Sequence, residues 1–287
     1  MLVERPLTGH IGAEIEGVDL RHPIAADLAA GLRDALDRHL VVFLRDQFLD
    51  IPRQKALTEV FGPLARSTYI GGMPDDPFVI RVIKEAEEKG GVFGGDWHSD
   101  LSFLEQPPAG SVLNAVEVPD VGGDSLWASQ VAAYEALPGD LRALLDGRDA
   151  VHVGKPHGVK WAPPPETRMT GAIPIVRDDP EADKERLHPA VLTHPVTGRR
   201  SIYVNPIYVT RFDGMTEEQS RPVLDRLRAH CIKPEFFCRF RWSAGTIAVW
   251  DNYSTLHYAV NDYAGFRRLM LRTTFSGRPM AAWRKAA

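Results

Sequence analysis

The chain has 287 residues, of which 44% are hydrophobic and 25% charged, and its formal net charge is −4 at pH 7. This composition is typical of a globular protein with a sizeable core. The negative balance argues against a nucleic-acid-binding surface, which needs clustered positive charge. No apolar run approaches the length of a bilayer span, and the first residues lack the apolar segment of a signal peptide. We therefore expect a cytoplasmic protein that binds neither nucleic acid nor membrane.

Hydrophobic patterning predicts both helices and strands in the first half of the chain. An amphipathic helix over 25–40 leads into a strand at 41–44, and further strands follow at 78–83 and 111–118. A helical segment over 132–145 contains a proline-glycine pair, which is expected to break it in two.

The second half predicts one more helix and then short strands. Thr216 and Gln219 have the spacing of a capping box, so a helix is expected to begin there and run to about Cys231. Short β-type runs follow at 236–242 and 246–252, separated by a glycine-containing turn.

A pair of metal-ligand residues lies in the segment Gly-Gly-Asp-Trp-His-Ser-Asp at 94–100. His98 and Asp100 point to the same side of an extended chain, so both can bind one ion, and a lone His257 follows far downstream. This pattern is that of the facial triad of non-haem Fe(II), which leaves one side of the metal open. Zinc is the rival metal, although the zinc hydrolase pattern His-Glu-x-x-His is absent. A His-x-Asp pair alone is more often an unrelated surface feature.

Two arginines follow His257 on one face of a predicted strand over 267–274. Arg268 and Arg272 alternate with apolar residues, and a rise of about 3.3 Å per residue places them about 13 Å apart. A guanidinium binds a carboxylate through two parallel hydrogen bonds and stays charged. One arginine could therefore hold the far carboxylate of a co-substrate while the other lies nearer the metal. The alternative is a solvated strand face, which Arg267 fits because it points the opposite way.

These motifs, in this order, resemble the taurine dioxygenase family of Fe(II)- and 2-oxoglutarate-dependent oxygenases, which also includes herbicide-cleaving and alkylsulfatase members. The motifs are Trp97-His98-Ser99-Asp100, Pro-Pro-Ala-Gly at 107–110, Gly-Gly-Asp-Ser-Leu-Trp at 122–127, Trp-Asp-Asn at 250–252 with His257, and Arg268 with Arg272. The resemblance extends from about residue 12 to about residue 275. It implies a mainly β, α+β fold: one double-stranded β-helix, or jelly-roll, domain over 1–287 with flanking helices.

The resemblance also implies roles for individual residues. The expected Fe(II) ligands are His98, Asp100 and His257. Arg268 would pair with the distal carboxylate of 2-oxoglutarate, and Ser125 stands where the family often has a threonine that helps to hold the same group. Arg272 would lie near the substrate and the metal-bound end of the co-substrate. The implied reaction uses O₂ to hydroxylate a small organic anion and gives succinate and CO₂. Hydroxylation beside a heteroatom would lead to C–S, C–O or C–N cleavage.

Positions that bind taurine in the family are largely changed here. Ser67 stands at the position of a histidine, Ile70 at that of a tyrosine and Gly94 at that of an asparagine, although Tyr69 could compensate. We therefore expect a substrate other than taurine, drawn from sulfonates, sulfate esters, carboxylates and phosphonates. The candidate substrate contacts are Ser67, Tyr69, Ile70, Phe93, Asn205 and Arg272.

A proline-rich, charged segment over 154–189 is expected to be an active-site lid, with a variable surface loop as the alternative. Lys155 and His157 could face the site from it. Cys231 and Cys238 are expected to be a reduced pair, with a disulfide as the alternative. We also expect a homo-oligomer, either a dimer or a tetramer.

Two other functions were weighed against the oxygenase. A non-catalytic relative could bind an organic anion or another metal, but it would not need all four of His98, Asp100, His257 and Arg268. A zinc hydrolase could use the same three metal ligands, and it would act without O₂.

Overall fold

The computed structural model describes residues 2–161, 164, 171–277 and 280–282, and its largest element is an eight-stranded sheet. The strand order is β1 (Val3–Pro6), β2 (Ala13–Glu16), β3 (Val41–Leu44), β14 (Ile247–Asp251), β6 (Gly110–Glu117), β16 (Arg268–Phe275) and β4 (Leu64–Ala65), and β5 (Ile80–Lys84) also pairs with β16. All five residues of β14 are buried, because this central strand is covered on both faces.

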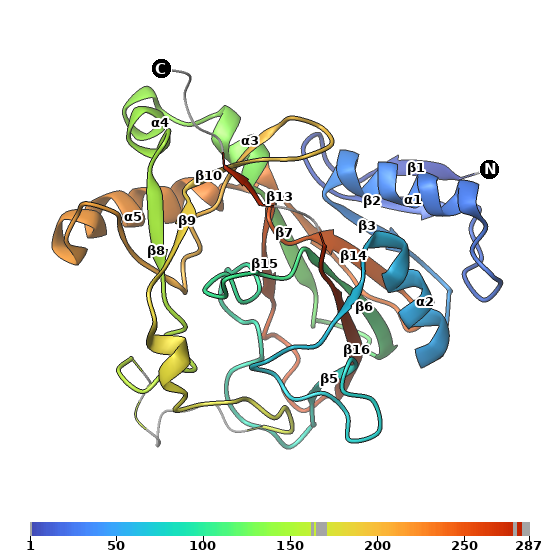
Figure 1. Cartoon of the computed structure of the whole chain (residues 1–287). Helices are drawn as coiled ribbons and strands as arrows, with labels where there is room; N and C mark the ends of the chain where they lie inside the picture. The colour runs from blue at the N-terminus through green and yellow to red at the C-terminus, as the bar shows by residue number, and fades with distance from the viewer. Residues whose placement is uncertain (1, 162–163, 165–170, 278–279, 283–287) are drawn as a thin grey trace.

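Three smaller sheets complete the β structure. They are β13-β7-β15 (Phe237–Phe240, Ser125–Ser129, Thr255–Ala259), β12-β8-β9 (Val209–Phe212, Asp149–His152, Arg186–Pro189) and β11-β10-β17 (Arg200–Ile202, Val191–Thr193, Ala281–Ala282). The first of these faces the large sheet (Figure 1).

An aromatic core fills the space between the two facing sheets. Phe43 of β3 stacks on Phe240 of β13 with ring centroids 3.8 Å apart, and Trp127 of β7 meets Phe43 edge-on at 5.2 Å. Trp250 of β14 is buried in the same cluster. Two mostly antiparallel sheets that enclose one core form the jelly roll that the family resemblance implied; the pairing of β2 with β3 is parallel.

Helices cover the outside of this sandwich. They are α1 (Ala26–His39), α2 (Ile51–Phe61), α3 (Gln130–Glu135), α4 (Gly139–Leu145) and α5 (Glu217–Cys231), with short 3₁₀ turns at Pro180–Asp183 and Pro234–Phe236. α1 and α2 lie on the outer face of the large sheet (Figure 1), where Leu36 and Leu57 pack with Val42 and Val249. The described residues include no helix long and apolar enough to cross a membrane.

Most predicted elements are confirmed within a few residues. α5 begins at Thr216 with the predicted capping box: Gln219 N donates to Thr216 Oγ1 at 3.2 Å, and Thr216 N donates to Gln219 Oε1 at 2.9 Å. The helix expected over 132–145 is two helices, α3 and α4, interrupted at the predicted proline-glycine pair. Cys231 and Cys238 are buried and unpaired.

The predicted lid segment is not a loop throughout, which corrects the boundary at 189. Its last residues form β9, which pairs with β8 from Asp149↔Pro189 to His152↔Arg186. The backbone groups of residues 186–189 are therefore bound in a sheet, and only the part before them can act as a lid. Residues 162–163 and 165–170 of the expected lid lie outside the described residues.

Candidate active site

The three predicted metal ligands, His98, Asp100 and His257, converge in the folded chain. Their ligand atoms lie within 4.8 Å of one another. The Nε2 atoms of His98 and His257 lie 3.7 and 3.8 Å from Asp100 Oδ1. Within the described residues, this is the one cluster of three or more His, Cys, Asp or Glu side chains close enough to hold a single ion.

A short backbone pairing brings the two histidines together. His257 lies in β15, and His98 exchanges two backbone hydrogen bonds with it, of 3.1 and 2.8 Å. Directly opposite residues of antiparallel strands place their side chains on the same side, and the two ring centroids are 4.1 Å apart. His98 Nδ1 lies 2.7 Å from the carbonyl oxygen of Asp96. A carbonyl only accepts, so Nδ1 carries the proton and Nε2 offers its lone pair to a metal.

The side chain of Asn252 forms hydrogen bonds with both the backbone N–H and the backbone carbonyl of Asp100. Asp100 N donates to Asn252 Oδ1 at 2.7 Å, and Asn252 Nδ2 donates to the carbonyl oxygens of Asp100 at 3.0 Å and Pro108 at 2.9 Å. Asn205 Nδ2 donates to the carbonyl oxygen of the preceding residue, Ser99, at 2.7 Å. Both asparagines are buried, so these bonds form away from water and fix the carboxylate ligand to the sheet.

The charge of Asp100 is balanced by its neighbours. Burial opposes ionisation of this carboxyl, but the charge of the neighbouring Arg272 guanidinium keeps its pKa below the ordinary value. Arg272 Nη1 lies 3.2 Å from Asp100 Oδ1. Burial, aided by the nearby His98, lowers the pKa of His257 to about 3. His257 is therefore neutral at physiological pH, which is the form that binds metals.

The donor set fits a divalent metal ion. Asp100 Oδ2 is buried and has no hydrogen-bond partner among the described residues. A buried carboxylate oxygen without a partner is costly unless a cation or donor binds it. Two neutral imidazoles and one carboxylate are the ligands of the 2-His-1-carboxylate site of non-haem iron.

Arg268 and Ser125 form a second polar group beside the metal ligands. Arg268, Met270 and Arg272 are buried on β16 while Leu269 and Leu271 are half-buried, as the alternation predicted. Arg268 Nη2 lies 3.5 Å from Ser125 Oγ, and burial lowers the pKa of the guanidinium.

These two residues also line a cavity of about 50 Å³ that His98, His257 and Arg272 border as well. A buried arginine of this kind needs an anionic partner, and a carboxylate would supply one. Arg267 instead points outward and binds Glu85 and Glu117, as expected for a surface residue.

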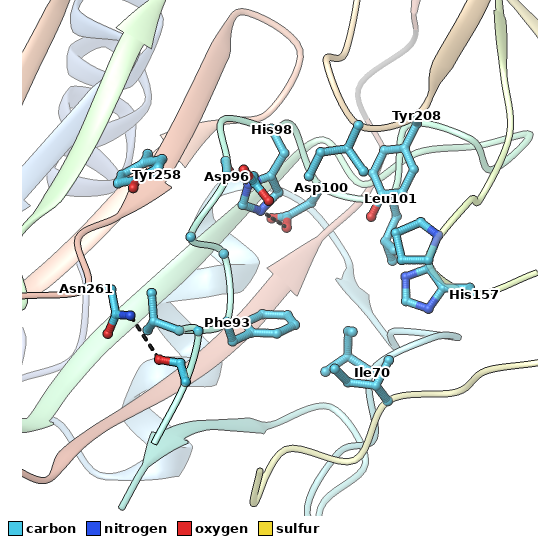
Figure 2. Close-up of a pocket in the computed structure, with 18 of the residues that line it drawn as sticks. Ile70, Phe93, Asp96, His98, Asp100, Leu101, His157, Tyr208, Tyr258 and Asn261 are labelled. Carbon is cyan, nitrogen blue, oxygen red and sulfur yellow. Dashed lines mark hydrogen bonds and ion pairs between the residues drawn. The ribbon is translucent and has the colours of Figure 1, made fainter. Parts of the chain in front are cut away.

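A larger cavity of about 650 Å³ opens on the other side of the metal ligands. It shares Phe93, His98 and Arg272 with the small cavity, so the two adjoin. Figure 2 shows Phe93 pointing toward the space between Asp100 and Ile70. Ile70 and Phe93 therefore lie where the sequence predicted substrate contacts.

Several lining residues of the large cavity were not predicted. They are Leu101, Ile207, Tyr208, Tyr258 and Asn261, whereas Pro156, Ile175 and Arg177 belong to the predicted lid segment. Tyr208 lies beside Asp100 in Figure 2, and burial together with the charge of Asp100 raises the pKa of its hydroxyl. No spacing rule links Tyr208 to the metal motif.

His157 faces the large cavity from the predicted lid and is buried rather than solvated. Its Nδ1 lies 2.9 Å from the carbonyl oxygen of Val176, and burial lowers its pKa. A backbone bridge between Ile70 and Ile175 joins the lid to the opposite loop. Lys155 does not reach the cavity and lines a separate surface groove.

Three predicted substrate contacts need correction, because they do not line the large cavity. Ser67 Oγ accepts a hydrogen bond from Ile70 N at 3.2 Å and so stabilises a turn. Tyr69 packs against residues around the cavity: the centroid of its ring lies 4.8 Å from that of His157 and 4.9 Å from that of Phe103. Asn205 uses its amide on backbone groups and borders the separate surface groove. Their side chains support the site without reaching the cavity.

The chain matches the model of the family described as "Taurine catabolism dioxygenase TauD, TfdA family" over residues 4–274. It belongs to this family. A crystal structure of a taurine dioxygenase from Burkholderia xenovorans superposes with a TM-score of 0.80 and 33% identity, covering 98% of this chain and 93% of that one. The jelly-roll fold and its mainly β content are thereby confirmed.

Two curated relatives are similar over nearly the whole chain. An alpha-ketoglutarate-dependent sulfate ester dioxygenase of Pseudomonas putida is 34% identical over 276 residues, covering 95% of this chain and 88% of the relative. An alkylsulfatase of Acinetobacter baylyi is 32% identical over 276 residues, covering 95% and 84%. Alpha-ketoglutarate is 2-oxoglutarate, so the chain is an oxidoreductase of the 2-oxoglutarate-dependent dioxygenase class.

Proposed function

We propose that this enzyme uses Fe(II), 2-oxoglutarate and O₂ to hydroxylate a small organic anion. The observation that carries the proposal is the convergence of His98, Asp100 and His257, with ligand atoms within 4.8 Å, beside the buried Arg268 and Arg272. When bound, the iron with 2-oxoglutarate and O₂ supplies oxidation of a substrate C–H bond, coupled to decarboxylation of the co-substrate to succinate and CO₂.

The protein's own residues bind and orient the reactants. His98, Asp100 and His257 would hold the iron through two Nε2 atoms and the carboxylate. Arg268 and the Ser125 hydroxyl would hold the distal carboxylate of 2-oxoglutarate in the small cavity, where burial strengthens each hydrogen bond. Phe93 lines both cavities, so its ring would help to exclude water from the meeting point of the two substrates.

The substrate would occupy the cavity of about 650 Å³ with its anionic group toward Arg272. Arg268 is committed to the co-substrate, so Arg272, which also pairs with Asp100, is the buried arginine among the described lining residues of this cavity that can take a second anion. Apolar residues of the wall, including Ile70, Leu101 and Ile207, suit a carbon chain or ring larger than that of taurine. Because the similar proteins include a sulfate ester dioxygenase, an alkylsulfatase and a taurine dioxygenase, sulfate esters and sulfonates lead the candidates, ahead of carboxylates and phosphonates.

A substrate screen tests this proposal. Alkyl sulfates, larger sulfonates, aryloxy acids, phosphonates and taurine are incubated with Fe(II), 2-oxoglutarate and O₂, and succinate is measured. We expect substrate-stimulated succinate with a larger anion and little with taurine. Taurine as the best substrate would contradict the assignment of the pocket, and product formation without O₂ would indicate a zinc hydrolase instead.

We further propose that the enzyme works in the cytoplasm as a dimer or tetramer. The unpaired Cys231 and Cys238 agree with a reducing compartment. The apolar side chains of Phe48, Val121 and Val196 are exposed and would be buried by contacts between subunits. Sedimentation velocity would measure the oligomeric state, and a single monomeric species at micromolar concentration would contradict it.

A further inference from the structure

The Ser125 hydroxyl lies between two groups that can only donate hydrogen bonds. Trp242 Nε1 donates to Ser125 Oγ at 3.1 Å, and Arg268 Nη2 lies 3.5 Å from the same oxygen. Neither an indole N–H nor a guanidinium has an acceptor. Ser125 must therefore act as acceptor toward both neighbours, and its own proton must point toward a third group.

The described part of the chain provides no acceptor for that proton. Trp242 and Arg268 are the side chains bonded to Ser125 Oγ there, and both are donors. Arg268 Nε is also buried without a hydrogen-bond partner among the described residues. Ser125 and Arg268 both line the cavity of about 50 Å³. Two unused donors at one small cavity match a carboxylate, whose two oxygens only accept.

We propose that Trp242 is a positioning residue for 2-oxoglutarate. Its indole N–H holds Ser125 Oγ as an acceptor, so that the Ser125 hydroxyl is turned to donate to the distal carboxylate of the co-substrate. This inference rests on the proposed function, which assigns that carboxylate to Ser125 and Arg268.

The packing around Trp242 fixes the direction of its N–H group. Its ring meets Phe240 edge-on with centroids 5.4 Å apart and lies 6.2 Å from Trp127. Arg268 Cζ lies 5.9 Å from the centre of the same ring, close enough for a cation–π contact. The indole thus contacts both groups that would hold the carboxylate. Without its N–H, only the longer contact with Arg268 Nη2 would restrict rotation of the Ser125 hydroxyl, and ligand binding would have to restrict it further.

A double-mutant cycle tests the proposal. Trp242→Phe keeps an aromatic ring and removes the N–H, and Ser125→Ala removes the hydroxyl. Binding of 2-oxoglutarate to the Mn(II)-loaded enzyme is measured by isothermal titration calorimetry without O₂. We expect Trp242→Phe to raise Kd about 3- to 10-fold, the effect of one buried hydrogen bond. In the Ser125→Ala background the same substitution should add less than twofold, because Trp242 acts through Ser125.

Ligand choice and kinetics separate this role from general support of the fold. The Kd of 2-oxobutyrate, which lacks the distal carboxylate, should be the same in wild type and Trp242→Phe. With 2-oxoglutarate, KM should rise while kcat at saturation stays within about twofold. The proposal would be overturned if Trp242→Phe raised the Kd of 2-oxoglutarate equally in the wild-type and Ser125→Ala backgrounds. It would also be overturned if Trp242→Phe weakened the binding of 2-oxoglutarate and 2-oxobutyrate equally. Unchanged Kd in both Ser125→Ala and Arg268→Ala would instead refute the proposed function.

A second measurement does not depend on the folding of Trp242→Phe. In ¹⁵N-tryptophan-labelled, Zn(II)-loaded protein, the Trp242 indole resonance should shift on addition of 2-oxoglutarate. It should shift much less with 2-oxobutyrate, and Ser125→Ala should displace it without ligand. If neither 2-oxoglutarate nor Ser125→Ala changed the chemical shift of the Trp242 indole resonance, the inference would be contradicted.

Discussion

The two sides of the large cavity are built in different ways. On the metal side, His98 is paired to β15, and the side chains of Asn252 and Asn205 make three hydrogen bonds to the backbone of Asp100 and the preceding Ser99. On the opposite side, the wall comes from loops, and a backbone bridge between Ile70 and Ile175 joins the predicted lid segment to the loop around Ile70.

Because one side is built on strands and the other on loops, the two sides are suited to different functions. Groups that must hold a metal geometry within a fraction of an ångström lie on strands and buried hydrogen bonds. Groups that only shape the cavity lie on loops, where sequence can change without disturbing the sheet. We therefore expect substitutions on the metal side to abolish the reaction, and substitutions in the wall to change which substrate is used.

Removing a metal ligand should have the largest effect. His98→Ala, Asp100→Ala and His257→Ala should each lower turnover more than about 100-fold, beyond the usual cost of losing an outer-shell partner, and should reduce bound iron. Activity and metal content by emission spectrometry measure this. His230→Ala is a matched control, since His230 is also buried but its Nε2 donates to the carbonyl oxygen of Ala133, away from the site. Near-normal activity in any of these three variants would contradict the assignment of His98, Asp100 and His257 as the metal ligands.

Arg268→Ala should weaken 2-oxoglutarate binding about 10- to 150-fold, because a charge-assisted hydrogen bond contributes roughly 1.5–3 kcal/mol. Calorimetric titration of the metal-loaded enzyme measures the change. Arg267→Ala is the control: it removes the adjacent arginine, which binds surface glutamates instead. If both variants bind 2-oxoglutarate like wild type, the co-substrate site lies elsewhere.

Asn252→Ala should lower metal affinity about 10- to 100-fold without removing a ligand, the usual range for an outer-shell partner. The loss frees the backbone of Asp100, whose N–H and carbonyl both bind Asn252. Competition with a metal-binding dye gives the affinity. Asn114→Ala, also buried and bonded to Leu49 and Gln54, should reduce the melting temperature but not the metal affinity. Equal metal affinities in the two variants would show that the Asn252 contacts do not position Asp100.

Tyr208→Phe should have the smallest effect and the most selective one. It keeps the ring, whose centroid lies 4.9 Å from that of Phe103, and removes a hydroxyl beside Asp100. We expect kcat/KM for the best anion to change about 3- to 10-fold, as for one hydrogen bond, with the Kd of 2-oxoglutarate unchanged. Parallel kinetics on two sulfate esters measure this. A loss of iron binding in this variant would contradict the separation of tasks.

Local rules predicted part of the metal side from spacing, whereas His257 was joined to it by the facial-triad pattern and the family resemblance. The i, i+2 geometry placed His98 with Asp100, the alternation of β16 placed Arg268 with Arg272, and the capping box fixed the start of α5. Each of these depends on residues within one element, so the sequence contains the information.

The cavity wall could not be predicted in the same way, because contacts between loops depend on tertiary packing. Tyr208 and Asn261 reach the cavity from positions that no period connects to the metal motif. Asn205 was expected to face substrate, yet its amide binds the backbone of Ser99 and Ile207. An asparagine after a strand fits either role by sequence, and only the fold decides between them.

An anaerobic titration of 2-oxoglutarate into the Fe(II)-loaded enzyme, followed by visible absorption, tests the central claim most directly. A metal held by two histidines and one carboxylate, with room for a chelating keto acid, should give a weak visible charge-transfer band. The band should saturate with 2-oxoglutarate, be absent in Asp100→Ala, and need more 2-oxoglutarate in Arg268→Ala. Binding of both iron and 2-oxoglutarate to the wild type without this band would contradict the account.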